Sequence, residues 1–235
     1  MTESINSTVN SPDLTWKSLY RIGGVCAILY VLIALVIPFF LFVNNTELSN
    51  MTKGTEILNM IAKNGNTWWV ALQTMVLGTS FFAIITFVAL FVALKHLDKA
   101  KAVVGAVTAI VIHILFIAYY PVMLGLSYLG QHYQSASETQ RMSFASAAEA
   151  LLAINNAFNP LYESIFAVSI LIISLVMLKG VFNKKVAYLG IMTSISAFIA
   201  LLLWPVVGIS YFWWWLLFMV WFIAVGWKLY RLGIV

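Results

Sequence analysis

Long apolar segments alternate with short polar segments along most of this chain. A helix needs about 20 apolar residues to cross the hydrocarbon core of a bilayer, and six of the segments are long enough. We expect transmembrane helices at about 22–43, 68–94, 102–126, 160–178, 186–206 and 212–229. Residues 1–16 are mostly polar and predict a disordered cytoplasmic tail, and residues 17–235 predict one six-span transmembrane domain.

Two of the polar segments have the pattern of an amphipathic helix. Between the first two spans, Ile57, Leu58, Met60 and Ile61 fall on one helical face, which predicts a helix lying on the membrane surface. Before the fourth span, S-A-S-E and S-E-T-Q fit the capping-box pattern, so a helix should begin near Ser135 or Ser137. Its apolar positions recur at three- and four-residue steps, at Phe144, Ala148, Leu151, Ile154 and Phe158.

Composition and charge give the same fold class and add an orientation. Of the 235 residues, 63% are hydrophobic and 9% are charged, whereas soluble domains carry about a quarter charged residues. Ten of the 13 Lys and Arg residues fall on one side of the expected spans, which places both termini in the cytoplasm. We therefore predict an all-α, polytopic membrane helical bundle in the cell membrane, with six transmembrane helices and two outer loops carrying amphipathic helices.

The same features exclude several classes of function. Basic residues placed beside spans indicate topology control, so no nucleic-acid partner is expected. Cys26 is the single cysteine and excludes an internal disulfide. No His, Asp or Glu spacing indicates a metal, no nucleotide-binding motif occurs, and no cofactor is expected.

Two segments rich in basic, aromatic and glycine residues resemble a known family. They read Y-R-I-G-G-V-C-A-I-L-Y-V-L at 20–32 and K-G-V-F-N-K-K-V-A-Y-L-G-I at 179–191. In these motifs the chain resembles the uncharacterised six-span prokaryotic membrane proteins of domain-of-unknown-function family 4386. The resemblance covers nearly the whole chain and implies a six-helix bundle, but the family supplies no established catalytic residues.

Two ionisable residues fall inside expected spans, where such residues are costly and indicate function by default. Glu163 lies about 6 Å inside the outer end of span four, and His113 lies near the middle of span three. If the helix is continuous, Asn156 and Asn159 share a face with Glu163. Gln73 reaches a similar depth, as do Tyr119 and Tyr120. These seven residues predict a polar ligand-binding cavity open to the outside, suited to proton relay or cation recognition.

Each part of this cavity also has a purely structural interpretation. Asn159 followed by Pro160 is a typical helix start, with Glu163 placed favourably near the first turn. His113 follows Gly105 and Ala109 at four-residue steps, which predicts an interhelical hydrogen bond within the bundle.

The sequence leaves three classes of function open. The first is a non-enzymatic membrane protein that binds or transports a small or amphiphilic ligand through the outer-leaflet cavity. The second is a structural or regulatory subunit of a membrane complex. The third is an intramembrane enzyme that acts on lipid, with Glu163 or His113 as general acid or base, although no catalytic set is identified. The expected partners are membrane lipids, such a ligand and further copies of the chain as a homo-oligomer.

Overall fold

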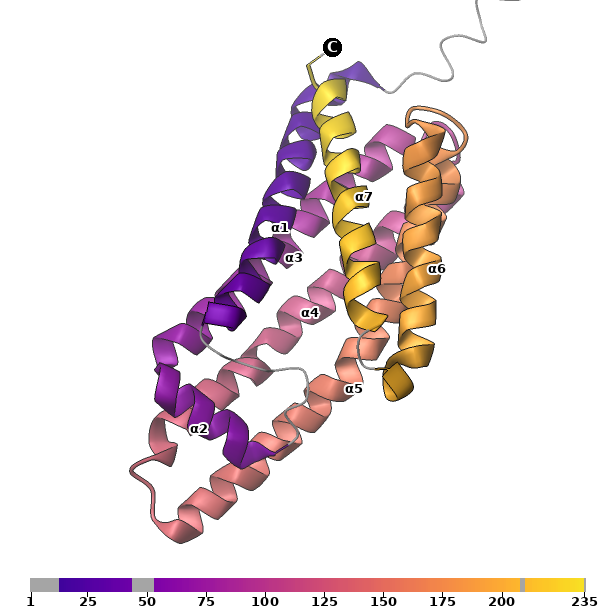
Figure 1. Cartoon of the computed structure of the whole chain (residues 1–235). Coiled ribbons are helices and arrows are strands. Elements are labelled where there is room, and N and C mark those ends of the chain that lie inside the picture. The colour runs from indigo at the N-terminus through magenta and orange to yellow at the C-terminus, as the bar shows by residue number, and fades with distance from the viewer. Residues whose placement is uncertain (1–12, 44–52, 208–209, 235) are drawn as a thin grey trace, which may run out of the picture. The chain divides into compact units, whose positions relative to one another are not determined.

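The computed structural model describes residues 13–43, 53–207 and 210–234. Within these ranges the chain forms a short 3-10 turn, seven α-helices and no strand (Figure 1). The helices are α1 (Lys17–Val43), α2 (Gly54–Asn64), α3 (Asn66–Leu94), α4 (Lys99–Tyr133), α5 (Glu138–Met177), α6 (Lys184–Val207) and α7 (Ser210–Leu232).

All the helices except α2 are long and apolar enough to cross a membrane, which gives six candidate spans within the described residues. This confirms the all-α, six-span fold of a multi-pass membrane protein. The cytoplasmic placement of the termini stays a prediction. The tail that the sequence predicts to be disordered lies outside the described residues, apart from residues 13–16.

The helices α4 and α5 are longer than a bilayer requires. They contain 35 and 40 residues, which correspond to about 50 and 60 Å of helix against a hydrocarbon core of about 30 Å. A large part of each helix therefore lies outside the hydrocarbon. In α5 that part is the N-terminal half, because the charged residues Glu138, Arg141 and Glu149 are found there.

The capping box before the fourth span is confirmed. The helix α5 begins at Glu138, directly after Ser137. The Ser137 backbone N–H donates to Gln140 Oε1 at 3.0 Å, and the Gln140 N–H donates to Ser137 Oγ at 3.5 Å. These two bonds satisfy backbone donors that the first turn of a helix leaves without partners.

The interpretation of Asn159-Pro160 as a helix start is wrong, because α5 continues through both residues to Met177. Proline removes one backbone donor from a helix interior but does not prevent helix continuation in a membrane protein, where neighbouring groups compensate. The apolar stripe also keeps its phase across the proline: Phe158, Tyr162 and Phe166 follow one another at four-residue steps.

The helices contribute to two compact units. The first unit consists of Met1–Val31, Phe81–Ile114 and Tyr162–Val235, and the second of Leu32–Ser80 and Leu115–Leu161. The first unit thus contains parts of α1, α3, α4 and α5 together with all of α6 and α7. In Figure 1, α6 (orange) and α7 (yellow) pack side by side in this unit.

Glycines bring α1 very close to α7 in the first unit. A methyl group added to Gly24 of α1 would lie 2.6 Å from both the carbonyl oxygen of Gly226 and the backbone nitrogen of Tyr230 in α7. On the other side of α1, the Thr86 hydroxyl of α3 donates to the Gly23 carbonyl at 3.1 Å. Small residues and interhelical hydrogen bonds of this kind hold transmembrane helices together, because lipid gives little hydrophobic drive for their association.

In the first unit, Asp98 of the loop between α3 and α4 joins two helices. Its Oδ1 caps α4 by accepting from the Lys101 N–H at 3.1 Å, and its Oδ2 accepts from Lys179 Nζ at 2.7 Å. The hydrogen bond from Lys179 and the bond from the Lys101 N–H lower the pKa of Asp98 from 3.8 to about 2. The carboxylate therefore links the start of α4 to the end of α5.

This ion pair predicts a small acid-dependent stability. A carboxylate whose pKa is lowered on folding stabilises the folded state above its unfolded pKa and loses that contribution as the pH falls through the folded value. We expect Asp98→Asn to unfold at a lower temperature than the wild type at pH 7 in detergent, and the difference to close between about pH 4 and pH 2. The pair is partly exposed, so added salt should reduce the difference at pH 7. A difference independent of pH would contradict the ionic role.

The second unit has a core built around α2. Ile57, Leu58 and Ile61 are buried in one cluster with Trp69 and Leu126. The expectation that this apolar face lies on the membrane surface is therefore wrong, because protein side chains cover it. The periodicity correctly predicted an amphipathic helix, but it could not distinguish lipid from protein as the apolar partner.

Candidate functional site

A buried histidine joins α4 to α5 in the first unit. His113 is fully buried, and its Nδ1 lies 2.7 Å from the carbonyl oxygen of Ala109 one turn earlier. A carbonyl only accepts, so Nδ1 carries the proton, and in the neutral tautomer Nε2 accepts from the Tyr162 hydroxyl at 3.0 Å. This is the interhelical hydrogen bond predicted from the spacing of His113 after Gly105 and Ala109.

Glu163 follows Tyr162 on the same helix and presents a carboxylate to the interior of the first unit. Its Oε2 is buried, and no hydrogen bond reaches this oxygen from the described residues. The carboxylate interacts electrostatically with Tyr30 of α1 and with Tyr162. Tyr30, His113, Tyr162 and Glu163 are called the polar cluster below.

Aromatic rings surround the polar cluster. The Tyr30 ring lies edge-on to Phe218 and Phe222 of α7, with centroids 5.5 and 5.0 Å apart. The His113 ring lies edge-on to Phe166 at 4.9 Å, and Phe166 contacts Phe87 at 5.8 Å. Most of these rings are fully buried. The cluster therefore combines one carboxylate and two phenols with an apolar, aromatic wall.

This arrangement favours recognition of positive charge or of a hydrogen-bond donor. A buried carboxylate oxygen without a donor is costly and calls for an explanation, such as a proton, a cation or a ligand donor. Aromatic faces and phenol oxygens also attract cations. His113 is hydrogen-bonded at both ring nitrogens, so it joins α4 to α5 and orients the Tyr162 hydroxyl.

The tyrosines and the glutamine predicted for the site lie in the second unit. The Tyr120 hydroxyl of α4 is 3.3 Å from the Thr74 hydroxyl of α3. The Tyr119 ring stacks on Phe158 of α5 at 4.8 Å, and its hydroxyl donates to Met123 Sδ at 3.0 Å. Gln73, one residue before Thr74, is half-buried.

The two asparagines also lie in the second unit, on α5. Asn156 is exposed and accepts a 3.4 Å hydrogen bond from its neighbour Asn155, and Asn159 is half-buried. The helix is continuous from 156 to 163, which was the condition for the predicted shared face with Glu163. Both asparagines belong to the second unit, whereas Glu163 belongs to the first.

Sequence reasoning missed Tyr30 and Tyr162. Both are tyrosines within or beside an apolar segment, and the pattern there is equally typical of packing residues. A usable signal existed for Tyr162, which lies at the four-residue step between Phe158 and Phe166 and therefore on the buried stripe of α5. Nothing local to Tyr30 indicates its proximity to Glu163.

Comparison of the chain with protein-family models, with curated proteins and with solved structures finds no match in any of the three. The resemblance to domain-of-unknown-function family 4386 therefore stays a prediction. Among the described residues, no group of three or more His, Cys, Asp and Glu side chains is placed to hold a metal ion.

Proposed function

We propose that this protein binds a small amphiphilic organic cation at Glu163 and moves it through the membrane. The single observation that carries the proposal is the buried Oε2 of Glu163, which no donor reaches among the described residues. An ionisable group in a membrane span is retained against its cost when it serves a ligand or ion. A cationic ligand would give this carboxylate a positively charged partner.

The aromatic wall supports an organic cation over a metal ion. Metal ions such as Ca²⁺ and Mg²⁺ take six or more oxygen ligands, whereas the polar cluster offers one carboxylate and two phenol groups. Quaternary ammonium groups are recognised by the faces of aromatic rings with a nearby anion. Tyr30 interacts electrostatically with Glu163 and packs against Phe218 and Phe222, so its ring is the candidate surface for such a cation.

His113 and Tyr162 act as positioning residues in this proposal. The hydrogen bond from Tyr162 to His113 fixes α5 against α4 directly beside Glu163. A fixed carboxylate binds a ligand with less loss of side-chain entropy than a mobile one. The orientation expected from Lys and Arg places access on the outer side of the cell membrane.

The proposal is tested with phenyltrimethylammonium, which combines a quaternary cation with one aromatic ring. Full-length protein in proteoliposomes should take up the radiolabelled cation faster than protein-free liposomes do. The neutral carbon isostere tert-butylbenzene has the same shape without the charge, so a large excess of it should not compete. If tert-butylbenzene competed as well as unlabelled phenyltrimethylammonium, the protein would be recognising shape alone, which would contradict the role of the carboxylate.

The other two classes of function predict different results in the same preparation. A structural or regulatory subunit would show no protein-dependent uptake and would co-purify with a stable partner from native membranes. An intramembrane enzyme would change the lipid composition of the proteoliposomes, which mass spectrometry detects. Either result, without cation uptake, would overturn the proposal.

A further inference from the structure

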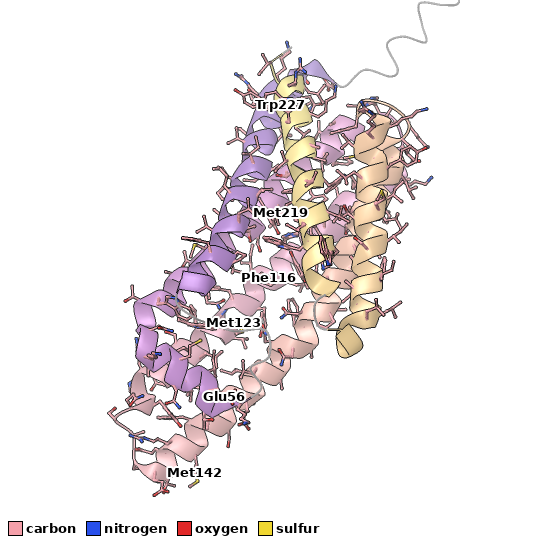
Figure 2. All side chains as sticks on the ribbon, in the orientation of Figure 1. Glu56, Phe116, Met123, Met142, Met219 and Trp227 are labelled. Atoms are coloured by element: carbon pink, nitrogen blue, oxygen red, sulfur yellow. The ribbon has the colours of Figure 1, made fainter. Side chains whose placement is uncertain are left out.

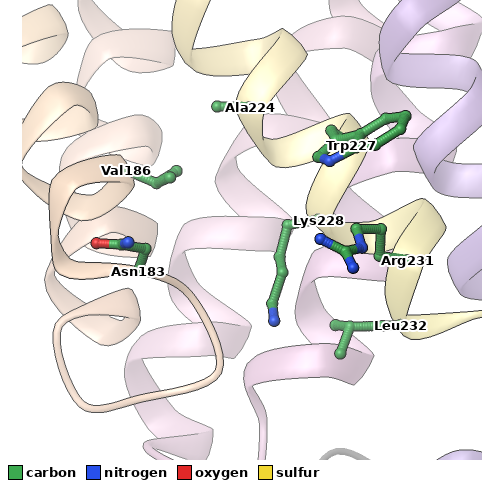
Figure 3. A pocket seen from close by; sticks show the side chains of 7 residues that line it. All are labelled: Asn183, Val186, Ala224, Trp227, Lys228, Arg231 and Leu232. Atoms are coloured by element: carbon green, nitrogen blue, oxygen red, sulfur yellow. The ribbon is translucent and has the colours of Figure 1, made fainter. Parts of the chain in front are cut away.

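A second candidate site lies between α6 and α7 and shares no residue with the polar cluster. A cavity of about 540 Å³ opens there beside the last turns of α7. Figure 3 shows Lys228 and Arg231 of α7 on one side of this cavity and Asn183 and Val186 on the other. The volume falls within the range of small-molecule sites in proteins.

The polar part of the wall consists of cations and an amide. Neither Lys228 nor Arg231 forms an ion pair within the described part of the chain, where the three ion pairs present involve other lysines. Asn183 Oδ1 accepts from the Lys185 N–H at 2.9 Å and so caps α6, which leaves the side-chain NH₂ of Asn183 as a donor. Two positive charges and an amide donor around one cavity favour an anion with several oxygen acceptors.

The remaining wall of the cavity is apolar. Val186, Ala224, Trp227 and Leu232 complete the lining. Trp227, near the C-terminal end of α7 in Figure 2, is 58% exposed. Tryptophan is enriched at the membrane–water interface, where its ring contacts acyl chains near the headgroups. The cavity therefore pairs an anion-binding end with a surface suited to hydrocarbon.

We propose that this cavity binds an anionic phospholipid, with its headgroup phosphate held by Lys228, Arg231 and Asn183. Its acyl chains lie against Val186, Ala224 and Trp227. The basic side of the spans is the expected cytoplasmic side, and the cytoplasmic leaflet carries the anionic lipids that such basic pockets between transmembrane helices bind. This site is independent of the cation proposed at Glu163.

The test compares phosphatidylglycerol with phosphatidylcholine on the full-length protein, by native mass spectrometry of lipid retained after release from mixed vesicles. Each basic side chain near an anionic surface strengthens binding about fivefold, so K228Q/R231Q should weaken phosphatidylglycerol retention about 25-fold. The matched variant K99Q/K184Q removes the same charge from two lysines that do not line the cavity. These lysines do not contact the proposed phosphate, and their long-range attraction is screened by salt, so this variant should weaken retention by about twofold or less.

A second variant keeps the proposal testable if the double substitution disturbs folding. Ala224→Trp fills the apolar part of the cavity and leaves both cations in place, and it should also abolish the preference for phosphatidylglycerol. Equal weakening by both double variants, or no preference for phosphatidylglycerol in the wild type, would overturn the proposal. Thermal stabilisation by inorganic phosphate as large as that by phosphatidylglycerol vesicles would assign the site to a soluble anion and overturn it as well.

Discussion

Replacing Gly24 with leucine is expected to lower the unfolding temperature by several degrees. Even a methyl group at this position would lie 2.6 Å from two backbone atoms of α7, which cannot rotate away as a side chain would. Overpacking of this kind costs about 3 kcal/mol, which corresponds to a fall of roughly 6–12 °C for a chain of this length. Thermal unfolding of purified protein in detergent measures the change.

Gly78 of α3 provides a matched control for this substitution. A methyl group added there would meet no atom within 4 Å, so Gly78→Leu makes the same chemical change in open space. We expect its unfolding temperature to equal or slightly exceed that of the wild type, because leucine favours helix more than glycine does. Gly226→Leu should behave like Gly24→Leu, since a methyl group there would lie 2.8 Å from Ala27 Cβ. Equal unfolding temperatures for Gly24→Leu and Gly78→Leu would contradict the close packing of α1 on α7.

Glu163→Gln is expected to weaken binding of phenyltrimethylammonium by about thirtyfold or more. Loss of one partner from a desolvated charge pair costs about 2–5 kcal/mol, and about 2 kcal/mol corresponds to this factor. Glutamine keeps the shape of the side chain, so the fold of α5 should be unaffected. Equilibrium dialysis of the labelled cation against protein in detergent gives the dissociation constants directly.

Two further variants separate the site from general electrostatics. Glu138→Gln removes the same charge from the exposed first turn of α5 and should leave binding unchanged within about twofold, because exposed charges are screened by salt. Glu163→Asp retains the charge on a shorter side chain and should bind better than Glu163→Gln. An equal loss of binding affinity in Glu163→Gln and Glu138→Gln would show that binding of the cation depends only on the net charge of the protein.

The six spans could be predicted from the sequence because lipid imposes a strong rule on every apolar segment. The boundaries were less secure where a helix leaves the bilayer. In α5 the local Asn159-Pro160 signal indicated a helix start, but the apolar stripe through Phe158, Tyr162 and Phe166 shows that the helix continues. The periodicity of apolar residues over several turns therefore predicts the course of this helix better than the Asn159-Pro160 pair does.

The candidate site could be predicted only in part. Glu163 and His113 were identifiable because ionisable residues are rare in spans. Their surroundings depend on which faces of α1, α4 and α5 meet, and no local pattern specifies that. The same limit applies to Asp98: its position before α4 is a recognisable helix cap, whereas its partner Lys179 lies 81 residues away in the sequence.

Binding of an organic cation by the Glu163 carboxylate can be tested by locating the bound cation in the protein. Crystals of the full-length protein grown with phenyltrimethylarsonium, the arsenic analogue of the probe, would reveal the arsenic by anomalous scattering. We expect an arsenic peak within about 4–6 Å of the Glu163 carboxylate, the range over which opposite charges interact strongly, and no such peak in Glu163→Gln. An arsenic peak that persists unchanged in Glu163→Gln, or that occurs only elsewhere in the molecule, would contradict it.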